Sequence, residues 1–276
     1  ASRPPGATAA LDLGSALREA RPMENLQFGP RYCETPDPIG GAFPIEPWNA
    51  ISSLVICVFG LAGLLLVARR APRAWPLYVL CVLLVVNGAG SVLWHGLRTR
   101  WALALDVQPA ILFVLFAALL WARRVAPLWQ AAGVVLALAL LPVAVRFLPL
   151  DMPAGGRMAL SGIVIVAAAL WLIVRTVRLS PAAALSGGAA LALALGALTF
   201  RSIDHLACGH LDQGSHFLWH ILLSSAAFTL VLHTHLPWLA HHGRWPVGEE
   251  WLYQSWSACY LPLVRVLRQY KILENF

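Results

Sequence analysis

Charged residues are scarce in this chain of 276 residues. Only 12% of them are Asp, Glu, Lys or Arg, whereas 59% are hydrophobic and the mean hydropathy is +0.70. A water-soluble domain of this size needs a polar surface that such a composition cannot supply. The composition therefore excludes an ordinary soluble enzyme and indicates an integral membrane protein.

Lysine is almost absent, and the single lysine, Lys271, lies near the end of the chain. A retinal protein needs a lysine within its helices to form a Schiff base, so this class is excluded. The five cysteines show no zinc-finger spacing. The net charge of +7 comes mainly from arginine in short loops, for which anionic lipid headgroups are the expected partner and nucleic acid is not.

Long apolar runs dominate the middle of the chain, and seven of them can cross about 30 Å of hydrocarbon as helices. They cover about residues 47–68, 75–97, 101–121, 127–147, 157–177, 181–203 and 215–236. Their short connections leave no room for a second folded domain. We therefore predict an all-α integral membrane bundle of seven transmembrane helices over residues 47–236. Residues 1–46 are expected to fold over its mouth, and residues 237–276 to form a cytoplasmic, interfacial tail.

Arginine also predicts the orientation of this bundle. The loops after the first, third and fifth apolar runs contain no acidic residue and carry Arg69, Arg70, Arg73, Arg123, Arg124, Arg175 and Arg178. Such loops are expected to be cytoplasmic. The opposite loops carry fewer arginines, Arg98 among them, and these are diluted by aspartate. Together with an alanine-, leucine- and arginine-rich composition, this favours a bacterial inner-membrane protein with its N-terminus in the periplasm.

Five polar side chains stand near the ends of these runs, where a membrane rarely holds polar groups without a function. They are Ser91 and His95 in the second run, Asp106 in the third, and His216 and His220 in the seventh. An even-numbered helix ends, and an odd-numbered helix begins, on the side where the N-terminus lies. All five residues are therefore expected on one side of the membrane, the periplasmic one.

The spacing of these residues adds a geometric argument. Ser91 and His95, like His216 and His220, are four residues apart, about one turn along the same side of a helix. Three histidines with an open fourth position form the ligand set of a catalytic zinc site. The alternative for any single histidine is an interfacial or hydrogen-bonded core residue, and we adopt that interpretation for His233.

Several motifs occur in one order between about residues 32 and 235. They are Tyr32-Cys33-Glu34, Glu46-Pro-Trp-Asn49, the run from Gly90 to His95 followed by Asp106, Ile203-Asp204 with Cys208, and His216-Phe-Leu-Trp-His220. In this order and spacing they resemble the alkaline ceramidases. That family belongs to a superfamily of seven-helix zinc hydrolases that also includes adiponectin-receptor-like proteins.

The resemblance implies a zinc-dependent amide hydrolase within the membrane. Its substrate would be a ceramide-like sphingolipid that enters from the bilayer, and its products a sphingoid base and a fatty acid. In this interpretation His95, His216 and His220 hold Zn²⁺, Asp106 acts as general base, and Ser91 donates a hydrogen bond to the developing oxyanion.

The resemblance also implies a Ca²⁺ site in the N-terminal segment. Glu34 and Glu46 match its carboxylates, whereas Arg31 and Pro36 stand at positions where ligands are expected, and Asp37 is the nearest replacement. Calcium needs six to eight oxygen ligands, so backbone carbonyls or water would have to complete the shell. The alternative is that these carboxylates cap the first helix or pair with Arg31.

The resemblance further pairs Cys33 with Cys208. Both cysteines are expected on the non-cytoplasmic side, where the compartment permits a disulfide. This bond would hold the N-terminal segment over the mouth of the bundle.

Two other classes of function stay open at this stage. One is a receptor or lipid-binding protein of the same superfamily, because a fold does not dictate a reaction. The other is a hydrolase of another acylated lipid. A transporter is disfavoured because the chain shows no inverted repeat and no pair of broken helices. The sequence does not predict an oligomeric state.

Overall fold

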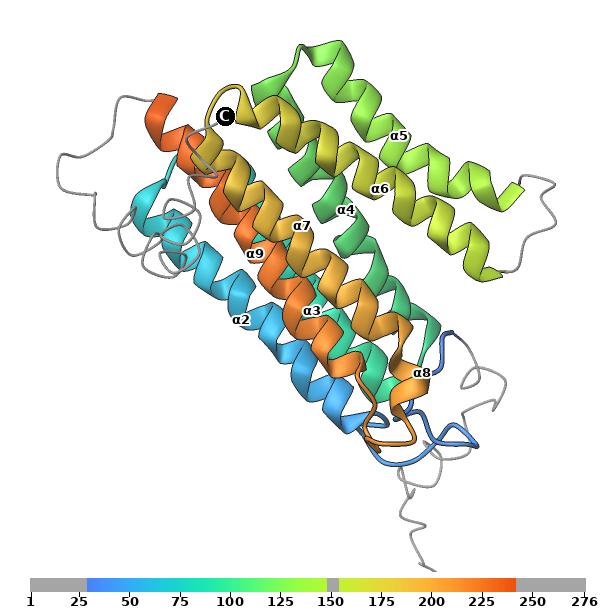
Figure 1. Ribbon diagram of the computed structural model, residues 1–276. Coiled ribbons are helices and arrows are strands. Elements are labelled where there is room, and N and C mark those ends of the chain that lie inside the picture. Colours follow the sequence, from blue (N-terminus) through green and yellow to red (C-terminus); the bar gives the residue numbers. More distant parts are fainter. Residues whose placement is uncertain (1–28, 148–153, 242–276) are drawn as a thin grey trace, which may run out of the picture. The chain divides into compact units, whose positions relative to one another are not determined.

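The computed structural model describes residues 29–147 and 154–241, and the regular structure among these residues is helical, with no strand. The helices are α2 (Pro47–Arg70), α3 (Trp75–Leu97), α4 (Arg100–Val125), α5 (Leu128–Phe147), α6 (Ala154–Val177), α7 (Pro181–Ser202), α8 (Asp204–Ala207) and α9 (His216–His241) (Figure 1). Each predicted apolar run coincides with one of these helices, and the ends differ by a few residues. The short α8 was not predicted.

Six of these helices are long and apolar enough to cross a membrane, namely α2, α3, α4, α5, α7 and α9. The described apolar stretch of α6, Gly162–Val177, is shorter. The structure therefore indicates a multi-pass membrane protein, while the seventh span and the orientation stay predictions. Residues 1–28 and 242–276 lie outside the described residues, and with them most of the predicted tail and part of the N-terminal segment.

Proline and a left-handed residue set the helix ends that matter for the site. Helix α2 begins at Pro47, where the missing amide hydrogen costs no intrahelical bond. Helix α3 ends at Leu97, because Arg98 adopts a left-handed backbone conformation with φ of 53°. The amide of Arg98 still donates to the carbonyl of Trp94, at 2.8 Å. This cap turns the chain sharply between α3 and α4.

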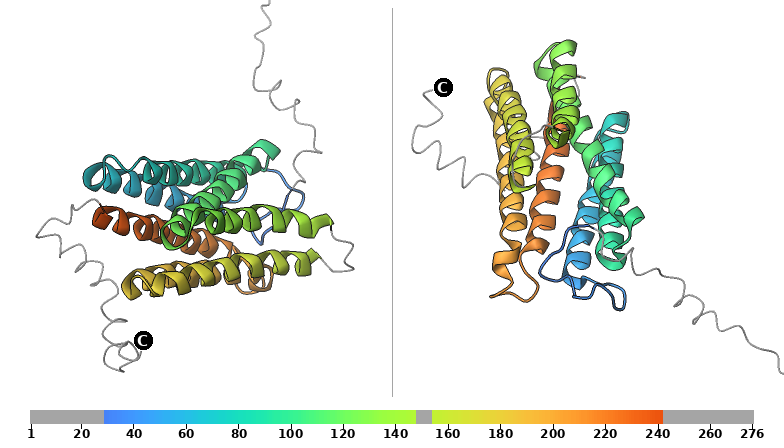
Figure 2. Two further views of the ribbon diagram at one scale, coloured as in Figure 1. Left: turned by 90° about the horizontal axis from the view of Figure 1, so that it is seen from above. Right: turned by 90° about the vertical axis from the view of Figure 1, so that its right-hand side faces the viewer.

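Consecutive helices pack against each other from α2 to α7, and the described residues up to Thr234 belong to one compact unit. Helix α9 lies between α2 and α7 in Figure 1, and the first view of Figure 2 also places it among the other helices. Side-chain contacts agree with this placement. Phe228 of α9 stacks on Phe59 of α2, and His233 of α9 contacts Ser186 of α7 and Trp121 of α4. Helix α9 thus forms the centre of the bundle.

Gly90 permits the close approach of α3 and α4. A Cβ atom at this position would overlap the backbone of Leu105 and Asp106. Small residues allow the backbones of membrane helices to approach in this way. This contact places the polar residues of α3 next to the start of α4.

Candidate metal centre

The end of α3 and the start of α9 bring three histidines together. His95, His216 and His220 are at most 3% exposed, and each offers a nitrogen within 4.8 Å of the others. The ring centroids lie 4.7 Å apart for His216 and His220, 4.9 Å for His95 and His220, and 5.3 Å for His95 and His216. Within the described residues, no other group of three or more His, Cys, Asp or Glu side chains has this geometry.

His95 is paired with a carboxylate. Its Nδ1 atom lies 2.5 Å from Oε2 of Glu46, the residue that precedes α2. The other oxygen of Glu46 accepts a hydrogen bond from the Thr35 hydroxyl at 2.5 Å and lies 3.3 Å from Nη1 of Arg98. Burial raises the pKa of Glu46, and the Arg98 guanidinium opposes that rise. The buried carboxylate therefore has a counter-charge on one side and an imidazole on the other.

His220 is held by two serines of α2. Its Nδ1 atom lies 2.8 Å from the hydroxyl of Ser52 and 3.4 Å from that of Ser53. The Ser53 hydroxyl also lies 3.0 Å from the hydroxyl of Ser91 on α3. Ser91 in turn lies close to the carboxyl of Asp106 on α4. A line of buried hydroxyls thus leads from one histidine of the cluster towards the predicted general base.

Asp106 is half-buried and receives a second polar contact from α3. The amide group of Asn87 donates to the backbone carbonyl of Asp106 and, at 3.2 Å, to its Oδ1 atom. Asn87, Ser91 and His95 are four residues apart and follow one side of α3, as the spacing predicted. The structure therefore places Ser91 and Asp106 near each other, and links Ser91 to the histidine cluster through Ser53.

His216 lies under an aromatic ring. The ring of Tyr32 stacks on it with centroids 3.7 Å apart and an interplanar angle of 23°. Its Nδ1 atom is buried and has no hydrogen-bond partner in the part of the chain that the structure describes. A buried polar atom without a partner is costly and calls for a ligand.

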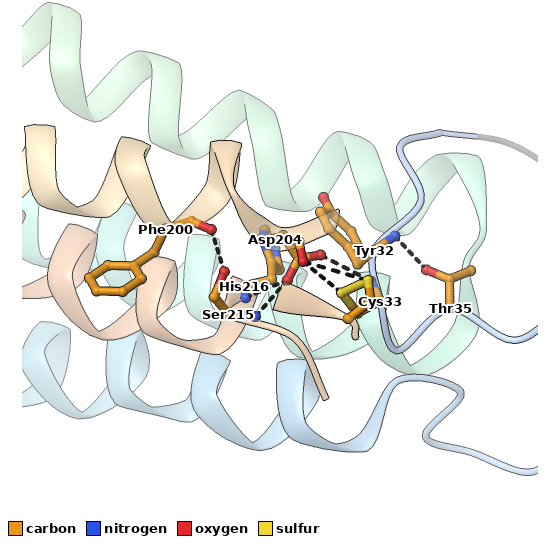
Figure 3. Close-up of a disulfide and its surroundings, with 8 residues drawn as sticks. Tyr32, Cys33, Thr35, Phe200, Asp204, Ser215 and His216 are labelled. Carbon is orange, nitrogen blue, oxygen red and sulfur yellow. Dashed lines mark hydrogen bonds between the residues drawn. A yellow bond between two sulfur atoms is a disulfide. The ribbon is translucent and has the colours of Figure 1, made fainter. Parts of the chain in front are cut away.

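Asp204 fixes the start of α9. Its Oδ1 atom accepts hydrogen bonds from the backbone amides of Ser215 and His216, at 2.7 and 2.9 Å, and its Oδ2 atom accepts one from Cys33, at 2.9 Å (Figure 3). Cys33 also forms a disulfide with Cys208, which confirms that prediction. The N-terminal segment is therefore tied to the helix that carries two of the histidines.

The three histidines fit a zinc ion. The Nδ1 atoms of His95 and His220 already have protein partners, so the Nε2 atom of each ring is the one available for a metal. Tetrahedral ligands about 2.0 Å from zinc lie about 3.4 Å from each other, so the rings need to move by little more than 1 Å to share one ion. A carboxylate on the remote nitrogen of a ligand histidine is the usual second layer of such a site.

The predicted calcium ligands are not gathered in this way. The carboxylate of Glu34 accepts the backbone amides of Trp48 and Asn49, at 2.6 and 2.9 Å. The Asp37 side chain is 79% exposed and lies 3.6 Å from Arg31. Glu34 thus caps the start of α2, and Asp37 pairs with Arg31. Both contacts agree with the alternative to a calcium site, in which these carboxylates cap the first helix or pair with Arg31. Calcium binding itself stays a prediction.

Sequence reasoning missed several residues of this site. The sequence predicts that Arg98 lies in a loop on the non-cytoplasmic side, and does not reveal that its side chain is fully buried beside Glu46. Ser52 and Ser53 were not singled out, although two adjacent hydroxyls in an apolar run are a weak signal. His233 was assigned to the core, and the Ser186 hydroxyl lies 2.8 Å from its Nδ1 atom, in agreement with that assignment.

Comparison with known proteins yields short matches. No protein-family model matches the chain. Probable 1,4-alpha-glucan branching enzymes of two Mycobacterium tuberculosis strains, CDC 1551 and H37Rv, are 90% identical over 40 residues, which is 14% of this chain and 8% of theirs. A 1,4-alpha-glucan branching enzyme of Thermococcus kodakarensis is 53% identical over 36 residues, 13% of this chain and 5% of its own. The chain thus spans less than a tenth of the length of these curated relatives, and the matches assign no family to it.

Proposed function

We propose that this chain is a seven-helix membrane hydrolase that uses zinc to cleave the amide bond of a ceramide-like sphingolipid. The observation that carries the proposal is the cluster of three buried histidines, one of which is paired with a buried carboxylate. The resemblance of the surrounding motifs to alkaline ceramidases supplies the substrate class. In this proposal, the site and the N-terminus both face the periplasm of a bacterial cell.

Two residues of the chain would carry the chemistry, Asp106 by proton transfer and Ser91 by a hydrogen bond. When bound, zinc polarises the amide carbonyl and makes water a better nucleophile at neutral pH. The carboxylate of Asp106 takes a proton from the attacking water and later delivers it to the departing amine. The Ser91 hydroxyl donates a hydrogen bond to the negative charge that develops on the carbonyl oxygen. The acyl carbon gains the hydroxyl group of water and the nitrogen gains the proton, so the products are a fatty acid and a sphingoid base.

Other residues hold the proposed ligands in place. The carboxylate of Glu46 accepts from Nδ1–H of His95 and so leaves the Nε2 atom of that ring unprotonated for the metal. The Ser52 hydroxyl donates to the carbonyl of Asn49, so its oxygen can accept Nδ1–H of His220 in the same way. Tyr32 covers His216 and shields that side of the cluster from water.

The outer faces of the helices suit a substrate that arrives from the bilayer. Large apolar side chains on α2 and α4 are more than half exposed, for example Val58, Leu61, Ile111 and Leu112. Such side chains are stable when lipid tails cover them. A lipid can therefore reach the polar cluster at the helix ends without leaving the membrane.

The matches to glucan branching enzymes do not contribute to this proposal, because they cover 14% of the chain or less. A receptor or lipid-binding protein and a hydrolase of another acylated lipid are the competing functions. They differ from the proposed function in measurable ways.

The test is to measure the metal content of the purified protein and the turnover of a labelled ceramide, with and without a zinc chelator. We expect about one zinc per chain and hydrolysis that the chelator abolishes. His216→Ala should lose both zinc and turnover. His233→Ala is the matched control, because this buried histidine lies on the same helix but contacts Ser186 and Trp121 instead of the cluster.

Each other outcome points to a different function. Zinc with hydrolysis of an acyl ester but not of ceramide would favour the other lipid hydrolase. Zinc with no hydrolysis of any acylated lipid would favour the receptor. Protein that holds no zinc and cleaves nothing would remove the proposal.

A further inference from the structure

Arg98 is buried beside the candidate metal centre, three residues after His95. Its side chain and that of Glu46 are both fully inaccessible to solvent. Moving a guanidinium and a carboxylate out of water costs several kcal/mol per ion, so a buried pair persists only where its geometry is well satisfied. If these two positions served only to end α3 and begin α2, apolar side chains would stabilise the bundle more than the ion pair does. The pair therefore calls for a role other than stability.

The guanidinium of Arg98 is held from several directions. Its Nη2 atom donates to the carbonyl of Pro30 at 2.7 Å, and its Nη1 atom lies 3.3 Å from Glu46. Its central carbon lies 4.1 Å from the ring centroid of Trp94 and 5.9 Å from that of Tyr32. Cation–π contacts of this kind strengthen when water is excluded. The charge thus has a defined position, fixed by the N-terminal segment and α3.

This fixed charge acts on the carboxylate of Glu46, whose two oxygens face different partners. Oε1 faces Arg98 and the hydroxyl of Thr35, and Oε2 faces Nδ1 of His95. The backbone adds a further link, because the amide of Glu46 donates to the carbonyl of His95 at 3.0 Å. A carboxylate held at both oxygens cannot turn, so the ring of His95 has one orientation available.

We propose that Arg98 is a positioning residue of the metal centre: through Glu46 it holds His95 in the orientation that binds the ion. The inference rests on the proposed function for the identity of the ion, zinc. It does not depend on which lipid the protein cleaves. Arg98 is not assigned a step in the reaction.

The experiment measures zinc affinity by competition with a chelator, on the full chain in lipid nanodiscs. Arg98→Met removes the charge and keeps the length of the side chain. We expect it to weaken zinc binding by about 10- to 100-fold, the usual effect of losing a second-layer partner. Arg98→Lys should recover part of the affinity, because it keeps the charge but cannot contact Glu46 and Pro30 with a planar fork. Arg73→Met, at an exposed arginine in the loop between α2 and α3, is the control and should leave the affinity unchanged.

A second readout separates positioning from plain stabilisation. In protein loaded with Co²⁺ in place of zinc, the visible absorption bands report the ligand geometry, and we expect Arg98→Met to shift them. If the variant only lowers the unfolding temperature, and both the zinc affinity and the cobalt spectrum match the wild type, the inference is wrong. Should Arg98→Met fail to fold, Glu46→Gln tests the same link, and wild-type zinc affinity in that variant would also overturn it.

The outcomes for the two proposals are distinguishable. Wild-type protein that binds zinc but cleaves no ceramide overturns the proposed reaction and leaves the role of Arg98 standing. Wild-type protein that binds no zinc overturns both. Normal zinc binding and turnover in Arg98→Met would overturn only the positioning role of Arg98.

Discussion

The carboxylate of Asp204 accepts a hydrogen bond of 2.9 Å from the backbone amide of His216. The same side chain accepts the amide of Cys33, which lies 171 positions earlier in the chain. One residue thus ties the first turn of α9 to the N-terminal segment. The position of a proposed zinc ligand therefore depends on a side chain that never contacts the metal.

Two substitutions of Asp204 should destabilise the start of α9 to different degrees. Asp204→Ala removes the acceptor for three amides, and we expect it to destabilise the protein by about 1.5–3 kcal/mol. Asp204→Asn keeps the Oδ1 acceptor for Ser215 and His216 but places an amide donor against Cys33, so it should cost less. Thermal unfolding in detergent measures both. Equal effects of the two substitutions would contradict the assigned contacts.

Loss of the disulfide should also destabilise the bundle mouth. Cys33 and Cys208 are 175 residues apart, so the bond constrains a long stretch of the unfolded chain. We expect Cys33→Ser with Cys208→Ser to lower the free energy of unfolding by about 2–5 kcal/mol. Mass spectrometry after thiol labelling checks the bond directly. In denaturant without reductant, label should appear on Cys57 and Cys81, the free cysteines of the described residues, and full labelling of Cys33 and Cys208 would refute the bond.

Substitution of two glycines by alanine should have opposite effects, one at the contact between α3 and α4 and the other on α7. In Gly90→Ala the new methyl group meets the backbone of Leu105 and Asp106, which side-chain rotation cannot relieve. We expect a loss of about 1–3 kcal/mol and weaker hydrolysis, because Asp106 is displaced from Ser91. Gly188→Ala on α7 meets nothing within 4 Å and should stabilise its helix by up to about 1 kcal/mol. Unfolding temperatures of the two variants test the sign of each effect.

Much of the fold could be predicted because membrane helices follow from composition alone. Apolar runs of sufficient length gave the main helices, and the alternation of helix directions placed His95, His216 and His220 on one side. The spacing of four residues gave the shared helix faces. These are local or topological rules, and they need no knowledge of which helices touch.

The layer of residues around the histidines could not be predicted in the same way. The contacts of Arg98 with Glu46, and of Asp204 with Cys33, join segments that are distant in the sequence. An arginine in a short loop is normally exposed. Nothing in its neighbours reveals that a left-handed turn at the end of α3 places this one in the interior.

The contacts around the histidines lead to a prediction about calcium that differs from the one that the family resemblance implies. Glu46 already has a fixed cation, Arg98, at 3.3 Å, and both oxygens of Glu34 accept amides at the start of α2. A calcium ion would have to displace these partners and collect six to eight oxygens. We therefore expect hydrolysis and stability to be independent of calcium.

The measurement varies free calcium from none to several millimolar while a zinc buffer holds free zinc constant, because common calcium chelators also remove zinc. Turnover and the unfolding temperature should not change across this range. Asp37→Asn should behave like the wild type, because that carboxylate is exposed and contacts only Arg31 among the described residues. A calcium-dependent rise in turnover that disappears in Glu34→Gln would show instead that the carboxylates rearrange around the ion. In that case the cap on α2 and the Arg98 pair would describe only the calcium-free form.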